Sequence, residues 1–201
     1  MLLPVRFSIG IQMMRSFLAL APIVTVALVS SLSLSARPGY AFDQAQLDQL
    51  RSTRQCVKCN LSGADLTGAD LTGAKLTGAS LSSAKLGDAN LTGADLTGAD
   101  LTGAELTGSK LRQAFLTRAN LTDADLTRAD LTRAELMSAD LTGARLTGTK
   151  LSSAKLGDAN LTGADLTGAD LTRADLTRAD LSGADLTGTR LTGADLTGAR
   201  R

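Results

Sequence analysis

The sequence predicts an all-β solenoid that is entered through a short helix and preceded by an export segment. From Leu61 to Leu196 every fifth residue is leucine, without a slip. The residue two positions before each leucine is alanine in all but four units. Only 2% of the residues are aromatic, so the core must be built from smaller side chains. The predicted parts are a signal segment at 1–41, a capping helix and cysteine entry at 42–58, and a repeat solenoid at 59–201.

A period of five residues fits neither regular element. In a strand, side chains alternate between faces, so an odd period sends successive leucines to opposite sides. In a helix, five residues turn by about 140°, which spreads the leucines around the axis. A chain that turns by a fixed angle in each five-residue unit keeps every leucine inside. Self-similarity at a short fixed period therefore indicates a solenoid whose stacked turns pair their backbones.

Residues 1–41 have the composition of an export segment. Two arginines precede an apolar run at residues 17–29, and the residues after that run are small and polar. A positive start, a short apolar run and small residues before a cut are typical of a secretory signal. We expect cleavage after Ala41, with Ala36 as the second site. The alternative is an uncleaved membrane anchor, for which the apolar run is short.

The segment between the signal and the repeat is expected to form a helical cap. Asp43 and Gln46 have the spacing of a capping box, and Phe42 with Leu47 that of a hydrophobic staple. We expect a short helix from about residue 44 to residue 52. Because an open solenoid end exposes unpaired backbone groups, this helix should lie over the first turn.

Cys56 and Cys59 fall in the repeat frame, at a leucine position and an alanine position respectively. Cys56 should therefore point inward at the first turn, and the resemblance of the repeat to a known solenoid family implies the same for Cys59. Export to an oxidising compartment favours a structural disulfide. The alternative is a redox-active C-x-x-C motif, which normally lies at an exposed helix N-terminus rather than at the entry to a solenoid. Two cysteines without histidine supply half of a zinc site, so no metal or cofactor is expected.

The runs Leu61-Ser-Gly-Ala-Asp65 and Leu66-Thr-Gly-Ala-Asp70, with their successors to Arg200, resemble the pentapeptide-repeat family over residues 59–201. The resemblance implies a right-handed quadrilateral β-helix with four units per coil, and thus about seven coils. It also implies that leucine and the small residue two before it point inward, whereas the other three positions point outward. The inward set includes Leu61, Leu66, Leu71, Leu126, Ala64 and Ala69.

Four units per coil would place every fourth unit on the same face. The acidic face, centred on Leu61 and its successors to Leu181, carries four aspartates and no basic residue over residues 60–183. The basic face, centred on Leu71 to Leu191, carries six basic residues and three acids. The candidate interaction residues are Arg133, Arg173, Lys110 and Lys150 on the basic face, Asp100 and Asp140 on the acidic face, and Phe115 as a large outward apolar residue. The alternative is that the outward charges only solvate the rod.

A duplication bears on how specific these faces are. Residues 81–102 and 151–172 are identical, and the second copy begins fourteen repeat units after the first. On a four-unit coil this offset is three and a half turns, so the two copies lie on opposite sides. A surface specified residue by residue should not survive such a shift, which makes the repeat frame and solubility the main constraints.

The sequence predicts a protein that is not an enzyme. It contains no histidine, and no Ser-His-Asp set, phosphate-binding glycine loop or zinc signature occurs in it. The main expectation is a non-enzymatic structural or protein-interaction rod with an unknown protein partner. One alternative is a thiol-redox protein acting through Cys56 and Cys59. The other is a DNA-mimic topoisomerase inhibitor, because some members of the family that the repeat resembles have this role. The export segment and the net charge of +1 disfavour it.

The resemblance also implies a location. An export signal, a short helix, a C-x-x-C motif and uninterrupted repeats together resemble exported family members of cyanobacteria and chloroplasts, which implies the thylakoid lumen or the periplasm. We expect no nucleic-acid partner, and no membrane contact unless residues 1–41 stay attached. The repeat frame continues to Ala199 and is followed by Arg200 and Arg201. We expect this end to form a homodimer, with arginine repulsion that keeps the ends apart as the alternative.

Overall fold

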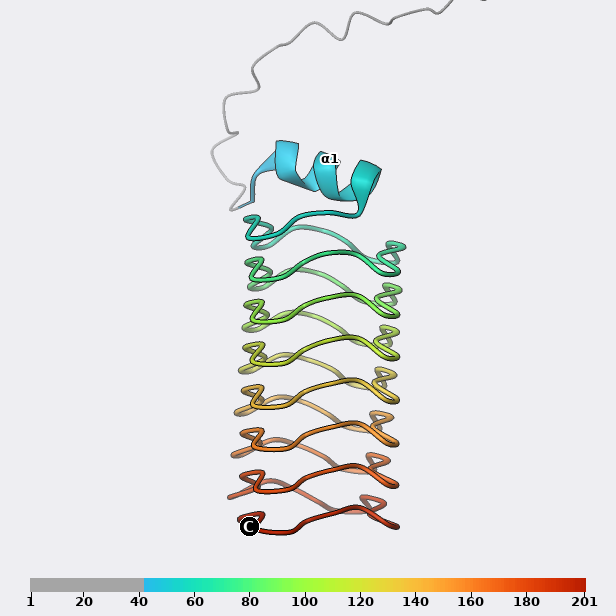
Figure 1. The fold of residues 1–201 in the computed structure, drawn as a ribbon, viewed down its shortest axis with the longest axis vertical. Helices are drawn as coiled ribbons and strands as arrows, with labels where there is room; N and C mark the ends of the chain where they lie inside the picture. The colour runs from blue at the N-terminus through green and yellow to red at the C-terminus, as the bar shows by residue number, and fades with distance from the viewer. Residues whose placement is uncertain (1–41) are drawn as a thin grey trace, which may run out of the picture. The chain divides into compact units, whose positions relative to one another are not determined.

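The computed structural model describes residues 42–201, and the predicted signal segment with its cleavage sites at Ala36 and Ala41 lies outside the described residues. Helix α1 (Gln44–Thr53) precedes a coil whose turns stack on one another, as Figure 1 shows. Among residues 42–201, no helix is long and apolar enough to span a lipid bilayer.

The turns of the coil are joined by parallel bridges between residues 20 apart in the chain. The bridges run from the pair Gln55 and Lys75 to the pair Asp180 and Arg200. Every bridging residue lies directly before a leucine position. Because the five-residue units follow one another without a slip, each turn contains four units, which is the number that the resemblance implies.

Every backbone N–H group of a middle unit has a hydrogen-bond partner, as residues 126–130 illustrate. Three of the five donate to neighbouring turns, one donates within the unit, and one donates to an aspartate side chain. The bonds run from Leu126 to Arg145 (2.8 Å), from Thr127 to Asp125 Oδ1 (3.0 Å), from Arg128 to Thr147 (3.0 Å), from Ala129 to Leu126 (2.9 Å) and from Asp130 to Ser109 (2.9 Å). The coil thus avoids the cost of unpaired amides without any long strand.

The second residue after each leucine position turns the corner. From Lys58 to Gly198, every residue at this spacing has a φ between 55° and 72°, in the left-handed region. Glycine adopts this region without strain, and 16 of these positions are glycine, but 13 are not, including Arg128. Gly87 and Gly157 differ, because they occupy the position directly after leucine and have no positive φ.

The leucine positions and the small-residue positions form the core. Leu61, Leu66, Leu71 and Leu126 are at most 2% exposed, and Ala64 is fully buried. The predicted core residue Ala69 is only partly buried, although it packs against the same cluster. Leu47 and Leu50 of α1 belong to this cluster too, so the helix and the coil share one apolar core.

Two hydroxyl side chains are buried at alanine positions, where the frame leaves little space for polar groups. Thr149 Oγ1 donates to the carbonyl oxygen of Leu126 in the preceding turn at 2.9 Å. Ser109 lies two turns earlier in the same interior column, and its buried Oγ has no hydrogen-bond partner. Thr189, two turns after Thr149 and partly buried, repeats this bond to the carbonyl oxygen of Leu166 at 2.8 Å, so Ser109 alone among the three hydroxyls is unsatisfied.

Candidate functional site

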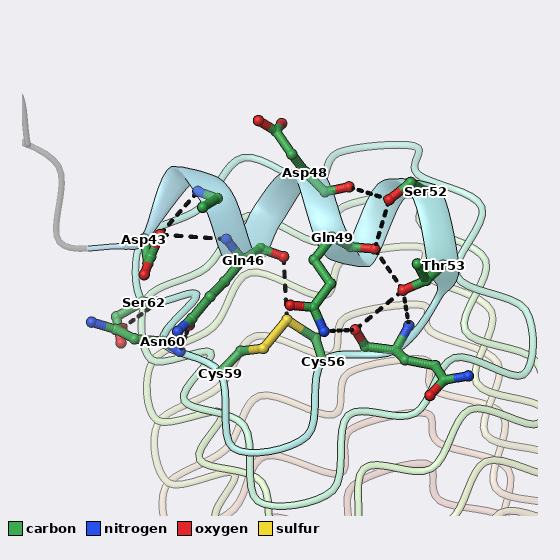
Figure 2. The surroundings of a disulfide bond; sticks show 12 residues. Asp43, Gln46, Asp48, Gln49, Ser52, Thr53, Cys56, Cys59, Asn60 and Ser62 are labelled. Carbon is green, nitrogen blue, oxygen red and sulfur yellow. Dashed lines mark hydrogen bonds between the residues drawn. A yellow bond between two sulfur atoms is a disulfide. The ribbon is translucent and has the colours of Figure 1, made fainter. Parts of the chain in front are cut away.

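The two cysteines form a disulfide beneath α1. Their Cα atoms are 5.3 Å apart, and Cys56 and Cys59 are 0% and 6% exposed. Figure 2 shows the bond between the helix and the loop that joins the cysteines, with Cys56 Sγ 3.2 Å from the carbonyl oxygen of Gln46. A redox-active C-x-x-C motif needs access to its substrate and normally lies at an exposed helix N-terminus. This pair has neither, so its geometry is that of a structural crosslink.

Residues of α1 satisfy the polar edge of the first turn. Asp43 begins the helix by accepting hydrogen bonds from the N–H groups of Ala45 and Gln46 at 2.9 and 3.4 Å. The predicted capping box is wrong in its second half, because Gln46 Oε1 accepts from the N–H of Asn60 at 2.6 Å instead of from Asp43. The N–H of Asp43 donates to the carbonyl oxygen of Asn60 at 3.0 Å.

Side chains of the helix also pair with the backbone of Gln55, in place of a preceding turn. Gln49 Nε2 donates to the Gln55 carbonyl at 3.0 Å, and the Gln55 N–H donates to Thr53 Oγ1 at 3.1 Å. In later turns, the preceding turn supplies both partners of a bridging residue. Side chains of α1 therefore take the place of a preceding turn, and this task draws Gln46 away from its own helix cap.

Aspartate and asparagine side chains before leucine have a structural task that the sequence reasoning missed. Each of the 17 such residues from Asn60 to Asp195 accepts a hydrogen bond from the N–H two residues later. At Asp100, for example, Oδ1 accepts from the Thr102 N–H at 3.0 Å and from its hydroxyl at 2.6 Å. The recurrent D-L-T spacing is the signal that could have revealed these Asx turns.

Hydrogen bonds of this kind also act on ionisation. The hydroxyl of Thr172 and, further, its backbone N–H lower the pKa of Asp170, against the opposing effect of burial. Ser182 lowers the pKa of Asp180 in the same way. At Asp130, burial raises the pKa, but hydrogen bonds from Thr132 and Arg112 outweigh it and leave the pKa below its ordinary value. These carboxylates are therefore charged at neutral pH.

On the basic face, every acid already has an arginine partner. Arg112 pairs with Asp130 at 3.2 Å, Arg190 pairs with Asp170 at 3.0 Å, and Arg54 pairs with Asp70 at 2.6 Å. The remaining cations of this face are exposed, and within residues 42–201 none of them has an ion pair or a side-chain hydrogen bond. They are the four predicted interaction residues Lys110, Lys150, Arg133 and Arg173.

The acidic face leaves carboxylates without cations. Asp180 pairs with Arg200 at 2.8 Å. Asp100, Asp123 and Asp140 have no cationic partner among the described residues. Asp100 and Asp140 hold their Asx turns through Oδ1, which orients their carboxylates at the surface, and Asp123 is an exposed corner residue. Opposite sides of the coil thus carry opposite residual charge.

The exposed apolar residue Phe115 lies on a third face, beside Met137. Their exposed fractions are 44% and 38%, and Phe115 bridges to Glu135, two residues before Met137. The ion pairs of Lys155 with Glu135 and of Arg178 with Asp158 occupy the same face. Phe115 is therefore separate from both the basic and the acidic face.

A shallow pocket beside α1 is lined by Phe42, Leu47, Gly63 and four charged or amide side chains. No group of three His, Cys, Asp or Glu residues in this part of the chain could hold a metal ion.

Comparison with known proteins identifies the repeat. The family model described as "Pentapeptide repeats (8 copies)" matches residues 55–93, 79–118, 99–136, 114–152 and 159–198. No curated protein matches the chain.

Solved structures with the same repeat come from several sources. HetL, a pentapeptide repeat protein involved in heterocyst differentiation regulation in the cyanobacterium Nostoc, is 42% identical; the match covers 72% of this chain and 69% of HetL, with a TM-score of 0.52. QnrB1, a plasmid-mediated fluoroquinolone resistance protein, is 26% identical over 73% of this chain and 81% of its own, with a TM-score of 0.56. A protein of the Arabidopsis thaliana thylakoid lumen is 32% identical over 57% of this chain and 66% of its own, with a TM-score of 0.22.

Proposed function

Because the chain belongs to the pentapeptide-repeat family, whose members form right-handed quadrilateral β-helices, we propose that it is a non-enzymatic interaction rod. The observation that carries this proposal is the distribution of unpaired charge. Four cations on one face and three carboxylates on the opposite face have no oppositely charged partner within the described residues. Charges that only solvated the rod would not need to segregate by side, whereas complementary surfaces steer and orient a partner.

The compartment that we propose is an exported one, the thylakoid lumen or the periplasm. The signal-like composition of residues 1–41 supports this, and so does the Cys56–Cys59 disulfide, because such crosslinks persist in oxidising compartments.

The two alternative functions have less support. A thiol-redox role would need an accessible sulfur, and both sulfurs belong to buried residues beneath α1. A DNA mimic would need a predominantly acidic rod, and the exposed cations Lys110, Lys150, Arg133 and Arg173 occupy one of its faces.

The test of the proposal is capture of the partner in the native host. An affinity tag inserted before Phe42, with the natural signal retained, allows isolation from the exported fraction after mild crosslinking. We expect one stoichiometric protein that is lost with the double variant Arg133→Glu and Arg173→Glu. The matched control is Arg118→Glu with Arg128→Glu, which reverses two arginines at equivalent corner positions on the other faces. Capture of no protein, not even the untagged copy of the chain from the host, or equal loss with the control, would contradict an interaction role for the basic face.

A further inference from the structure

We propose that the partner of the basic face is a second copy of this chain, so that copies associate side by side with the basic face of one against the acidic face of the next. This inference rests on the proposed interaction role and names the partner. Its starting point is that neither face can neutralise itself. The acids of the basic face are already paired with Arg112, Arg190 and Arg54, and the acidic face contains no basic residue over residues 60–183.

The residual charges of the two faces have the same axial spacing. Lys110 and Lys150 are separated by two turns of the coil, and so are Arg133 and Arg173. On the opposite face, Asp100 and Asp140 are also separated by two turns. With stacked turns about 4.8 Å apart, each spacing is roughly 10 Å along the rod. Two surfaces with one common period can match in series instead of at a single point.

The lateral positions of the charges are complementary too. The chain runs in the same sense around every side of the coil. When two parallel copies face each other, the residue before leucine on one face therefore lies opposite the corner residue on the other. Asp100 and Asp140 precede leucine, and Arg133 and Arg173 are corner residues. The third carboxylate, Asp123, is itself a corner residue and therefore lies opposite a residue before leucine on the basic face.

One axial shift between the copies brings all three carboxylates opposite cations. Along the chain, Arg133 follows Asp100 by somewhat more than one and a half turns, and Arg173 follows Asp140 by the same interval. Lys150 follows Asp123 by about one and a third turns. These intervals correspond to axial shifts of about 8 and about 6.5 Å, a difference that lysine and arginine side chains easily bridge.

The residues between the charges are compatible with this register. In the column of Asp100 and Asp140, the intervening residues are Asn120 and Asn160, which make the same Asx turns without a charge. The shift that places these aspartates opposite arginines also places Asn120 opposite Ser153 and Asn160 opposite Gly193. Neutral residues thus face neutral residues, and no carboxylate is placed against another carboxylate.

The cations of the basic face also lie outside the copied segment. The second copy covers residues 151–172, and Lys150 and Arg173 lie directly on either side of it. The residues that flank the first copy are Ser80 and Gly103, which are uncharged. The cations that distinguish the basic face are therefore found where the two halves of the rod differ.

Pairing of two different faces on one molecule leaves both outer faces free. Such a head-to-tail contact does not close on itself, so the expected product is an open row of parallel rods. Exposed ion pairs are individually weak and screened by salt, which makes association concentration-dependent at low salt and negligible at high salt.

The test uses sedimentation velocity of the protein purified from cells that express the full chain, at about 20 and about 500 mM salt. One variant is Arg133→Glu with Arg173→Glu. The second is Asp100→Asn, Asp123→Asn and Asp140→Asn, which removes three negative charges. At positions 100 and 140, the new amide oxygen can accept the same backbone hydrogen bond that Asn120 accepts in this column. Its control is Asp65→Asn, Asp88→Asn and Asp185→Asn, which removes the same number of charges from a neighbouring face. Asp65 and Asp185 precede leucine, as Asp100 and Asp140 do, and Asp88 is a corner residue, as Asp123 is.

We expect wild type and control to associate at low salt and each face variant to associate at least about tenfold more weakly. Mixing the two face variants, each of which retains one intact face, should give heterodimers that do not grow further. Wild type that stays monomeric at low salt, an aspartate variant that associates like wild type, or a mixture that remains monomeric would each overturn the proposal. If the aspartate variant associates like wild type, the basic face binds another acidic surface. None of these results affects capture of a different protein in the host, so the interaction role is tested separately.

Discussion

The turn around Leu126 and the first turn beneath α1 share one five-residue frame but are stabilised by different groups. In the middle of the rod, each bridging residue is paired with the turn before and the turn after it. At the first turn, Asp43, Gln46 and Gln49 supply the partners on one side, and the Cys56–Cys59 disulfide joins the frame beneath the helix. A repeat is therefore stable by virtue of its neighbours, and its end requires residues that depart from the repeat.

The largest expected effect comes from a charge in a middle turn. Leu126→Asp should destabilise the fold by at least about 4–5 kcal/mol, because Leu126 is fully buried and an unpaired carboxylate there would lose its hydration. Circular dichroism during heating would then show no cooperative transition. Arg128→Asp introduces the same side chain at an exposed corner two residues later and should change stability by less than about 1 kcal/mol. A Leu126→Asp protein that melts like wild type would refute the inward position.

Acid should weaken the coil throughout its length. Eleven aspartates have a pKa below the ordinary 3.8, chiefly through hydrogen bonds from threonine or serine: Asp65, Asp70, Asp95, Asp125, Asp130, Asp158, Asp165, Asp170, Asp180, Asp185 and Asp195, with arginine as the donor at Asp158. A pKa that folding lowers contributes stability above the unfolded value, and this contribution is lost as the pH falls through the folded value. The melting temperature should therefore change little from about pH 7 to 5 and fall below about pH 4. A melting temperature that rises below pH 4 would contradict this.

Removal of the crosslink should weaken the first turn alone. The double variant Cys56→Ala and Cys59→Ala should lose about 2 kcal/mol locally, the entropy estimate for a four-residue loop. Hydrogen exchange should accelerate for the amides of α1, whereas the amide of Leu126 should keep its protection because its neighbouring turns are intact. Reductant should reproduce the effect in wild type and leave the variant unchanged. Equal acceleration at Leu126 would show that the end and the middle are not separable.

The smallest expected effect is a gain from the buried hydroxyl of Ser109. Ser109→Ala should stabilise the rod by about 1 kcal/mol, because the serine Oγ has no hydrogen-bond partner. Thr149→Ala, in the same interior column, should destabilise by about 1 kcal/mol, since it removes the hydrogen bond to the Leu126 carbonyl. Denaturant midpoints measure both changes. Shifts of the same sign would show that volume, and not hydrogen bonding, governs this column.

Much of the architecture follows from the sequence because its period is strict. A chain that turns by a fixed angle in each five-residue unit buries an apolar residue at every fifth position, so the pattern alone predicts that Leu61 and Leu126 lie inside. The inward position of Cys56 follows from the same frame, and that of Cys59 from the family resemblance. The helix was predicted within one residue of its end at Thr53, because the N-cap and the two leucines have local signatures.

The roles of the outward side chains were harder to predict, since they depend on contacts between turns. Gln46 looks like a capping residue in sequence, yet its amide oxygen accepts from the distant N–H of Asn60. The sequence counts six cations on the basic face, but only the stacking shows that Arg112 reaches Asp130 in the next turn and that Lys110 has no such partner among the described residues. In the sequence, Asp100 and Asp140 look like free surface charges, but in the structure each of them accepts a hydrogen bond from a backbone N–H.

The sequence by itself determined the solenoid and its inward leucines, because both depend on the period of the chain, and the segregation of charge by side followed once the family resemblance supplied four units per coil. The tertiary structure alone decided which charges remain unpaired, which aspartates hold turns and what closes the first turn. Those outcomes depend on distances between residues in different turns and between the helix and the coil, and a linear pattern does not contain such distances.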